Sequence, residues 1–241
     1  MKNVSPIVSV TTLEIFPDKV EEFRDLLEQS ASLHQSVAPL RLIGIPEKNK
    51  GNGEVVTIHY FKGGVQERKE VQAAMKSSSE WKEFVKSTNP YTLGRYSNLF
   101  KEAPFLQKTD KAPGLEPLAA EALNIASPGI IEAKRAKFQM SGRGGDAMTK
   151  FLTIYKKGLA AKVDAPGVDP STTLVTVLYS KNDEEATVME IWRHDDEDAL
   201  DKSRAAMRNC QEWMKTAAFI KKQADNVSSQ TFKSLSFSPI H

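Results

Sequence analysis

The stretch that decides the fold of this chain is written twice. Residues 73–81 read Ala-Ala-Met-Lys-Ser-Ser-Ser-Glu-Trp, and residues 205–213 read Ala-Ala-Met-Arg-Asn-Cys-Gln-Glu-Trp. Five of the nine positions are identical, and the copies lie 132 residues apart. The same offset sets Tyr60 over Trp192, each near the end of a strand-like run. Because solenoid repeats have periods of about 20–50 residues, a period this long indicates two tandem domains.

A helical pattern upstream of each copy supports the duplication. Apolar residues with helical spacing occur at Val20, Phe23, Leu27 and Ala31, and again 128 residues later at Met148, Phe151, Tyr155 and Leu159. Such a stripe is typical of the buried face of an amphipathic helix. The two offsets differ by four residues, which indicates a net insertion in the second half. The segment 164–170, rich in turn-forming residues, is the expected place for it.

Each half then reads as strand, helix, strand, strand, helix, strand. These elements are expected at 7–16, 18–37, 40–45, 54–61, 65–88 (with a break near 77–79) and 91–100, and again at 130–140, 145–162, 172–180, 185–193, 196–225 and 229–237. This order is the split βαβ, or ferredoxin-like, plan. We therefore predict an α+β fold with domains at 1–102 and 129–241, joined by a proline-containing linker at 103–128. Two such units can form a pseudo-dimeric α+β barrel.

Composition and charge restrict the function class. The chain has 241 residues, 27% of them charged, with 33 Lys and Arg against 31 Asp and Glu and a net charge of +2. These interspersed charges argue against a nucleic-acid binder. The single cysteine, Cys210, can form neither an internal disulfide nor a cysteine-based zinc site. Neither a targeting segment nor a membrane span is evident, so we expect a cytoplasmic protein.

Short motifs give each half a resemblance to a known family. In the first half, the strand 54–61, then Glu67-Arg68-Lys69, then the run Ser79-Glu80-Trp81-Lys82-Glu83-Phe84-Val85 resemble a NIPSNAP-type domain. In the second half, residues 189–200, from Met-Glu-Ile-Trp-Arg-His to Asp-Ala-Leu, resemble the antibiotic-biosynthesis monooxygenase domain. The first half has Lys62-Gly63-Gly64 in place of the usual acidic turn, and the second lacks the arginine that opens its helix.

Both families belong to the dimeric α+β barrel superfamily, so the resemblance implies that fold for residues 7–100 and 130–237. The families include cofactor-free oxygenases, haem-degrading enzymes, polyketide cyclases and proteins without known chemistry. Because one fold hosts many activities, the resemblance predicts architecture and leaves the activity open.

Three candidate site residues lie in the first half. His59 alternates with Tyr60 along the strand 54–61, so the two face opposite sides of the sheet. If His59 faces a pocket, its imidazole can act as a catalytic acid or base, and otherwise it is a structural histidine. Tyr96 is a candidate for capping a pocket or for ordinary strand packing. The 132-residue offset places Ile191 opposite His59.

The candidates of the second half share one strand face. Glu190, Trp192 and His194 alternate along the strand 185–193 and its end. A carboxylate in mid-strand needs a partner or has a raised pKa, so Glu190 is a candidate catalytic residue, with Trp192 and His194 as ligand contacts. The alternative is that Glu190 faces solvent or pairs with a Lys or Arg. Trp81 and Trp213 could stack on a planar substrate or could pack in the core.

Two functional hypotheses follow. The first is a protein that binds, or a cofactor-independent oxygenase or cyclase that converts, a small apolar or aromatic molecule, with His59, Tyr60, Glu190 and Trp192 as its candidate residues. The second is a non-catalytic NIPSNAP-like interaction scaffold. The four histidines have no metal-ligand spacing, so we expect neither a metal nor a cofactor, although the fold leaves haem open. A homodimer beyond the internal pseudo-dimer is also an open expectation.

Overall fold

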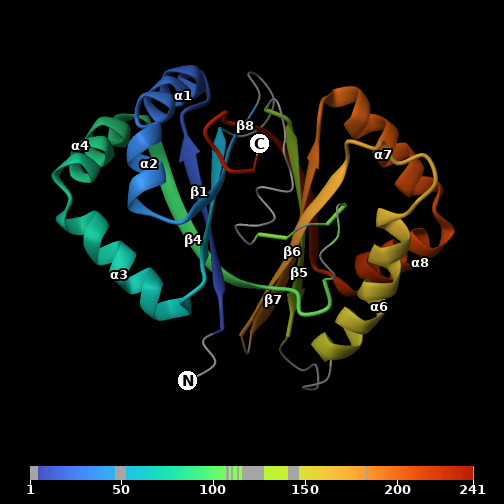
Figure 1. Ribbon diagram of the computed structural model, residues 1–241. Helices are drawn as coiled ribbons and strands as arrows, with labels where there is room; N and C mark the ends of the chain where they lie inside the picture. Colours follow the sequence, from blue (N-terminus) through green and yellow to red (C-terminus); the bar gives the residue numbers. More distant parts are fainter. Residues whose placement is uncertain are drawn as a thin grey trace. The chain divides into compact units, whose positions relative to one another are not determined.

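The computed structural model describes residues 5–46, 53–106, 109, 111–112, 114–115, 128–140, 147–182 and 184–240. These residues divide into two compact units, drawn with their elements in Figure 1. The first unit contains the chain up to Lys101 and again from Thr231 onward. The second contains the chain from Glu102 to the middle of the linker and again from Gly129 to Gln230. Residues 47–52, which include most of the hairpin loop expected at 48–53, and most of the predicted linker lie outside the described residues.

The first unit has its strands and helices in the predicted order. They are β1 (Ile7–Ile15), α1 (Val20–Gln29), α2 (Ala31–Val37), β2 (Leu40–Ile45), β3 (Glu54–Phe61), α3 (Gly64–Ser77), α4 (Ser79–Thr88) and β4 (Thr92–Glu102), with short 3-10 turns at Pro17–Lys19 and Asn89–Tyr91. Strand β1 pairs antiparallel with β3 and β4, and β3 pairs antiparallel with β2. All four helices lie on one side of this sheet (Figure 1). Phe23 and Leu27 of α1 pack there against Val55.

The second unit repeats this plan. Its elements are β5 (Ile130–Gln139), α6 (Ala147–Val163), β6 (Thr173–Lys181), β7 (Glu185–His194), α7 (Glu197–Asn209), α8 (Gln211–Gln223) and β8 (Asn226–Ser234). Strand β7 pairs antiparallel with both β5 and β6. Helices α6, α7 and α8 cover one side of the sheet (Figure 1). Phe151 and Tyr155 of α6, Val188 and Trp192 of β7, and Ile220 of α8 form its core. Both halves therefore have the predicted ferredoxin-like order.

The domain boundary at 129–241 needs one correction, because the end of the chain packs into the first unit. Strand β8 pairs with β2 through Gly44 opposite Ser234. Beyond the strand, Leu235 N–H donates to the Ile43 carbonyl at 3.1 Å, and Ile240 N–H donates to the Arg41 carbonyl at 2.9 Å. Leu235 is buried in the core that contains Val55. Burial of these apolar residues is the physical reason that the final segment completes the first unit.

A shared irregularity in the two sheets corrects the alignment of the halves. Both sheets have a register shift at the same place: Leu40 pairs with His59 and Leu42 with Ile58, while Leu174 pairs with Trp192 and Thr176 with Ile191. His59 therefore corresponds to Trp192 and Ile58 to Ile191, an offset of 133 rather than 132. The extra residue of the first half lies in the following helix, because α3 has 14 residues and α7 has 13. The expected pairing of His59 with Ile191 is wrong by one residue.

The second helix of each half is broken at equivalent points. In the first half, the expected break near 77–79 is confirmed: Ser78 separates α3 from α4, and its hydroxyl accepts a hydrogen bond from the Trp81 N–H. In the second half we expected one helix over 196–225, and this expectation is wrong because Cys210 separates α7 from α8 in extended conformation. Among the described helices, none is long and apolar enough to cross a membrane.

Candidate functional site

A buried carboxylate lies at the centre of the second unit. Strand alternation turns Glu190 toward the helices, together with Val188 and Trp192, and leaves it 5% exposed. Its Oε1 accepts a hydrogen bond of 2.6 Å from the Tyr155 hydroxyl. Its Oε2 accepts from the Trp192 indole at 2.6 Å and from the Lys162 ammonium. The carboxylate therefore has a donor on each oxygen, which is the arrangement a buried charge requires.

Lys162 comes from the inward face of α6, on the same stripe as Phe151, Tyr155 and Leu159. It is 1% exposed, and its Nζ lies 4.0 Å from the centroid of the Trp213 ring and 4.8 Å from that of Trp192. Two aromatic faces and one carboxylate thus surround the ammonium.

The protonation states in this cluster follow from burial and charge. Burial lowers the pKa of Lys162 to about 8, although Glu190 acts in the opposite direction. Burial alone would raise the pKa of Glu190, but the positive charges of Lys162 and Lys134 hold it below its ordinary value. Burial and the charge of Glu190 raise the pKa of the Tyr155 hydroxyl well above its ordinary value. Near neutral pH the cluster is therefore an ion pair with a protonated tyrosine.

Glu190 and Tyr155 line a cavity of about 460 Å³ between the sheet and helices α6 and α8. The other lining residues are mostly apolar: Lys134, Arg135, Ala136, Phe151, Val188, Trp213, Ala217, Ile220, Lys221, Val227, Ser228 and Ser229. Pockets of roughly 300–1,000 Å³ with apolar walls and a few polar groups are typical of small-molecule sites. Among the described residues that line this cavity, Glu190 is the only acidic one.

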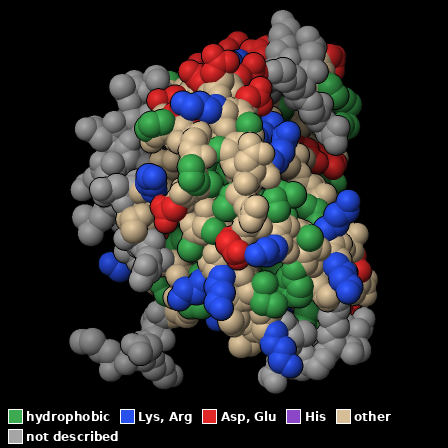
Figure 2. Space-filling view, turned by 90° about the vertical axis from the view of Figure 1, so that its right-hand side faces the viewer, with side chains coloured by type: hydrophobic (Ala, Val, Ile, Leu, Met, Phe, Trp, Pro, Cys, Tyr) green, Lys and Arg blue, Asp and Glu red, His purple; other side chains and the backbone are tan. Residues whose placement is uncertain are grey.

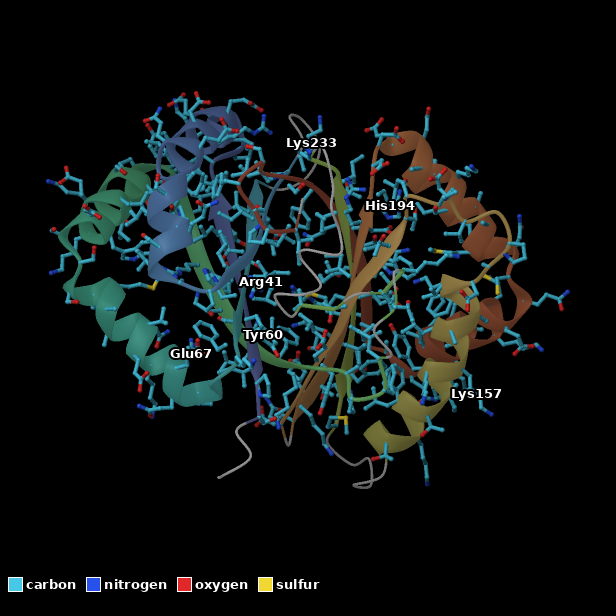
Figure 3. All side chains as sticks on the ribbon, in the orientation of Figure 1. Arg41, Tyr60, Glu67, Lys157, His194 and Lys233 are labelled. Atoms are coloured by element: carbon cyan, nitrogen blue, oxygen red, sulfur yellow. The ribbon has the colours of Figure 1, made fainter. Side chains whose placement is uncertain are left out.

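A second polar cluster lies at the end of β7, where Figure 3 labels His194. The Nδ1 of His194 lies 2.9 Å from the Thr172 hydroxyl, which in turn lies 2.7 Å from the Ser203 hydroxyl. The Nε2 of His194 lies 3.7 Å from the buried carboxylate of Glu132. Arg204 donates to the other oxygen of Glu132 at 2.9 Å. His194 is fully buried and is not among the residues that line the cavity.

The carboxylate of Glu132 also contacts two residues of the cavity wall. Burial would raise its pKa, but contacts with His194, Lys134 and Arg204 lower it well below its ordinary range. The Nζ of Lys134 lies 2.8 Å from Oε2 of Glu132, and the Ser229 hydroxyl donates to its Oε1 at 3.1 Å. Glu132 thus holds two lining residues, Lys134 and Ser229, in place.

The three candidates of the first half do not come together on one face. His59 is half-buried on the helix-facing side of β3, with its ring centroid 6.3 Å from that of Phe61. Burial, together with the charges of His34 and Arg95, lowers its pKa to about 4. Tyr60, labelled in Figure 3, is buried on the opposite face of the strand. Tyr96 is 51% exposed, and a hydrogen bond to Glu14 raises the pKa of its hydroxyl.

The first unit does contain a buried histidine on a helix, His34 of α2. Its ring centroid lies 4.7 Å from that of Phe84 and 5.3 Å from that of Trp81, and Phe237 is stacked at 6.2 Å. These rings fill the space beside the imidazole that a haem face would occupy, so His34 does not fit an axial haem ligand. Among the described residues, no group of three His, Cys, Asp or Glu side chains could hold a metal ion.

The structure therefore assembles a different set of residues from the one that the sequence suggested. Glu190 and Trp192 share a face as expected, and Glu190 pairs with a lysine, which was the alternative interpretation. Tyr155, Lys162 and Trp213 complete the cluster. Lys162 was missed, although its position on the apolar stripe of α6, three residues after Leu159, is a signal that the sequence offers.

Comparisons with known proteins give the fold of the whole chain. No protein-family model matches it, and no curated protein matches its sequence. A solved structure described as that of an anthrone oxidase-like protein is similar with a TM-score of 0.62 and 12% identity, covering 97% of this chain and 92% of that one. Two proteins described as candidate monooxygenases are also similar at 12% identity. That from Fusobacterium nucleatum has a TM-score of 0.59 (97% and 94% covered) and that from Lactobacillus acidophilus 0.57 (95% and 94%).

Shorter solved structures match less than half of the chain. A NIPSNAP-like domain protein from Burkholderia xenovorans is 20% identical with a TM-score of 0.38, covering 44% of this chain and 92% of that one. The predicted α+β fold class is confirmed.

Proposed function

We propose that the second unit binds a small, largely apolar aromatic molecule in the cavity between its sheet and helices α6 and α8. The observation that carries the proposal is an apolar cavity of about 460 Å³ that ends on a fully paired carboxylate. Phe151, Trp213 and Ile220 supply apolar and aromatic walls, which favour a planar ligand through burial and ring stacking.

In this proposal the polar cluster positions the molecule. Both oxygens of Glu190 already accept hydrogen bonds, and its lowered pKa makes it a weak base. The raised pKa of Tyr155 keeps its proton on the hydroxyl oxygen. Proton transfer by this pair is therefore unfavourable near neutral pH. We assign Glu190 and Tyr155 to ligand contact, and Lys162 and Trp192 to holding Glu190 in place.

The similar structures suggest which compounds to test first. Because the identity is 12%, the anthrone oxidase-like protein and the candidate monooxygenases share only the fold with this chain. Tricyclic aromatic ketones such as anthrone are nevertheless small enough for a cavity of this size, and they carry the aromatic surface that its walls would bury.

Binding can be tested with a substitution that fills the cavity. Ala217 lines it from α8, so Ala217→Trp places an indole inside it. We expect saturable binding of the neutral fluorescent probe N-phenyl-1-naphthylamine to the wild type, and an affinity at least about tenfold lower in Ala217→Trp. The matched control is Val85→Trp, 132 residues earlier on α4, which should bind the probe like the wild type.

Oxygen uptake with anthrone, measured on the same three proteins, addresses the oxygenase hypothesis. Turnover that Ala217→Trp abolishes and Val85→Trp retains would extend the proposal from binding to catalysis. If the probe binds the wild type and Ala217→Trp equally, the cavity is not the binding site. Absence of saturable binding in the wild type would favour the interaction-scaffold alternative.

A further inference from the structure

The charged residues around the cavity bear on the charge of the ligand that it would bind. Glu190, the acidic residue that lines it, is neutralised by Lys162 behind it. Lys134 lies beside Glu190 on the neighbouring strand, since the two residues pair across β5 and β7. Lys134 and Lys221 both line the cavity. The carboxylate of Glu190 is therefore already paired with Lys162, while two further cations of the described lining, Lys134 and Lys221, face the cavity.

The environment of Lys134 does not cancel this charge. Its partner Glu132 is shared with Arg204, whose Nη2 lies 2.8 Å from Oε1 and whose Nη1 lies 4.0 Å from the exposed carboxylate of Asp201, so the buried carboxylate of Glu132 faces two cations. Lys221 lies in the last turn of α8 and is exposed. Among the described residues, no carboxylate forms an ion pair with Lys221. The wall of the cavity thus holds an excess of positive charge in an apolar setting, where a charge is more effective than in water.

Charge is distributed unevenly over this side of the second unit. Figure 2, which looks onto that side, shows Asp and Glu side chains gathered at its upper edge and Lys and Arg side chains spread over its middle and lower part. The start of α7 is acidic, with Glu197 and Asp198 in its first turn, whereas the last turn of α8 holds Lys221 and Lys222. An anion approaching the C-terminal end of α8 therefore meets Lys221 and Lys222 first.

We propose that the cavity selects aromatic acids, that is, planar apolar molecules carrying one carboxylate, sulfonate or phenolate group. The aromatic body lies against Phe151, Trp213 and Ile220, and the acidic group lies toward Lys134 and Lys221. This inference rests on the proposed function, because it assumes that the cavity binds a small molecule. It adds the charge of the ligand and the two residues that recognise it.

Two probes with the same aromatic body separate charge from apolar binding. N-phenyl-1-naphthylamine is neutral, and 8-anilinonaphthalene-1-sulfonate adds one sulfonate to the same rings. We expect the wild type to bind the sulfonate at least about fivefold more tightly than the neutral probe at low ionic strength. Raising the salt concentration from about 0.05 M to about 0.5 M should lower the affinity of the sulfonate probe and not that of the neutral probe, because salt screens charge and does not weaken apolar contact.

Variants test which residues cause the preference for the sulfonate probe. Lys134→Met/Lys221→Met should lower the affinity for the sulfonate by about fivefold or more relative to the affinity for the neutral probe. Lys157→Met/Lys222→Met removes the same charge from exposed positions outside the cavity, one of them labelled in Figure 3, and should leave both affinities unchanged. Because Lys221 is exposed, Lys221→Met alone provides a variant whose folding is not at risk.

The outcomes distinguish the two proposals. If neither probe binds the wild type, the proposed function fails and this inference fails with it. If the neutral probe binds and the sulfonate binds no more tightly, the proposed function stands and the preference for an acid is wrong. The preference is also wrong if Lys134→Met/Lys221→Met behaves like Lys157→Met/Lys222→Met toward the sulfonate.

Discussion

Buried titratable residues occupy equivalent places in the two halves. The 128-residue offset between α1–α2 and α6 pairs His34 with Lys162, and the 133-residue offset between the strands pairs Thr57 with Glu190. The first half therefore has no carboxylate at the position of Glu190, which in the second half pairs with the buried Lys162. A lysine in place of His34 would be a buried charge without a partner, whereas an imidazole can be buried in its neutral form.

We expect acid to destabilise the first unit through protonation of His34. Burial lowers the pKa of His34 from 6.5 to about 4, so the folded protein keeps it neutral while the unfolded chain takes up a proton below about pH 6.5. Protonation thus favours the unfolded state, and stability is lost as the pH falls from 6.5 to about 4. Over this range we expect His34 to account for about 3 kcal/mol of the free energy of unfolding.

The measurement is urea unfolding at several pH values for the wild type and His34→Leu. His59 and the carboxylates titrate in both proteins, so the difference between the two curves reports His34 together with its charge coupling to His59. We expect the wild type to lose more stability than His34→Leu on acidification. Parallel curves would show that the His34 imidazole becomes protonated without unfolding.

Sequence reasoning recovered part of the site at this scale. The alternation of β7 correctly placed Glu190 with Trp192, because a period of two is independent of tertiary contacts. Lys162 was not identified, since a lysine on a helix is usually solvated and only the opposing Glu190 makes its burial possible. The cavity could not be predicted, because its volume depends on how α6 and α8 pack.

At the scale of elements, α6 and α8 are in close contact where Gly158 faces Thr216. A Cβ atom at Gly158 would overlap the Thr216 side chain, with its Oγ1, Cβ and Cγ2 all inside contact distance. Glycine costs a helix about 1 kcal/mol relative to alanine. The close contact offsets that cost, and it brings together the two helices that line the cavity.

Gly158→Ala should therefore destabilise the protein, against the expectation from helix propensity. We expect a loss of about 1–3 kcal/mol in the free energy of unfolding, because the added methyl group overpacks the contact. Denaturant unfolding of Gly158→Ala, Thr216→Gly and the double variant measures it. The double variant should lose less than the sum of the single variants, since removing the Thr216 side chain makes room for the new methyl group. A more stable Gly158→Ala protein would contradict the close packing.

The elements themselves were predicted better than their alignment. Six elements in each half follow from hydrophobic periodicity, and the break at Ser78 follows from a run of serines. The break at Cys210 was not predicted, because Arg208-Asn209-Cys210-Gln211 contains neither proline nor glycine. Sequence identity in the helices gave an offset of 132, but the one-residue difference between α3 and α7 shifts the strands to 133. A shift of one residue reverses the face of every strand side chain.

At the scale of the whole molecule, the covalent order of the chain and the composition of its units differ. The final segment from Thr231 onward belongs to the first unit, although more than 100 residues of the second unit separate it from β4. Leu235 and Ile240 are 4% and 1% exposed. Burying an aliphatic side chain contributes about 1.5–3 kcal/mol, which is a large share of the 5–15 kcal/mol that stabilises a typical domain.

A fragment comprising residues 1–102 should therefore fold poorly on its own. It retains the four strands and four helices of the first half, but β2 loses its partner β8 and the core loses Leu235. We expect little cooperative thermal unfolding by circular dichroism for the fragment alone. Adding a synthetic peptide of residues 229–241 should restore a cooperative transition whose midpoint rises with peptide concentration, because the peptide binds only the folded state.

The matched control is the same peptide with Leu235→Asp, which places a charge where the core requires an apolar side chain and should restore nothing. If the fragment alone unfolds cooperatively at the same temperature with and without the peptide, the boundary at residue 102 marks an autonomous domain after all. If only the unmodified peptide rescues it, the first unit depends on the end of the chain. The first copy of the repeat would then be recognisable in the sequence but unable to fold without the end of the chain.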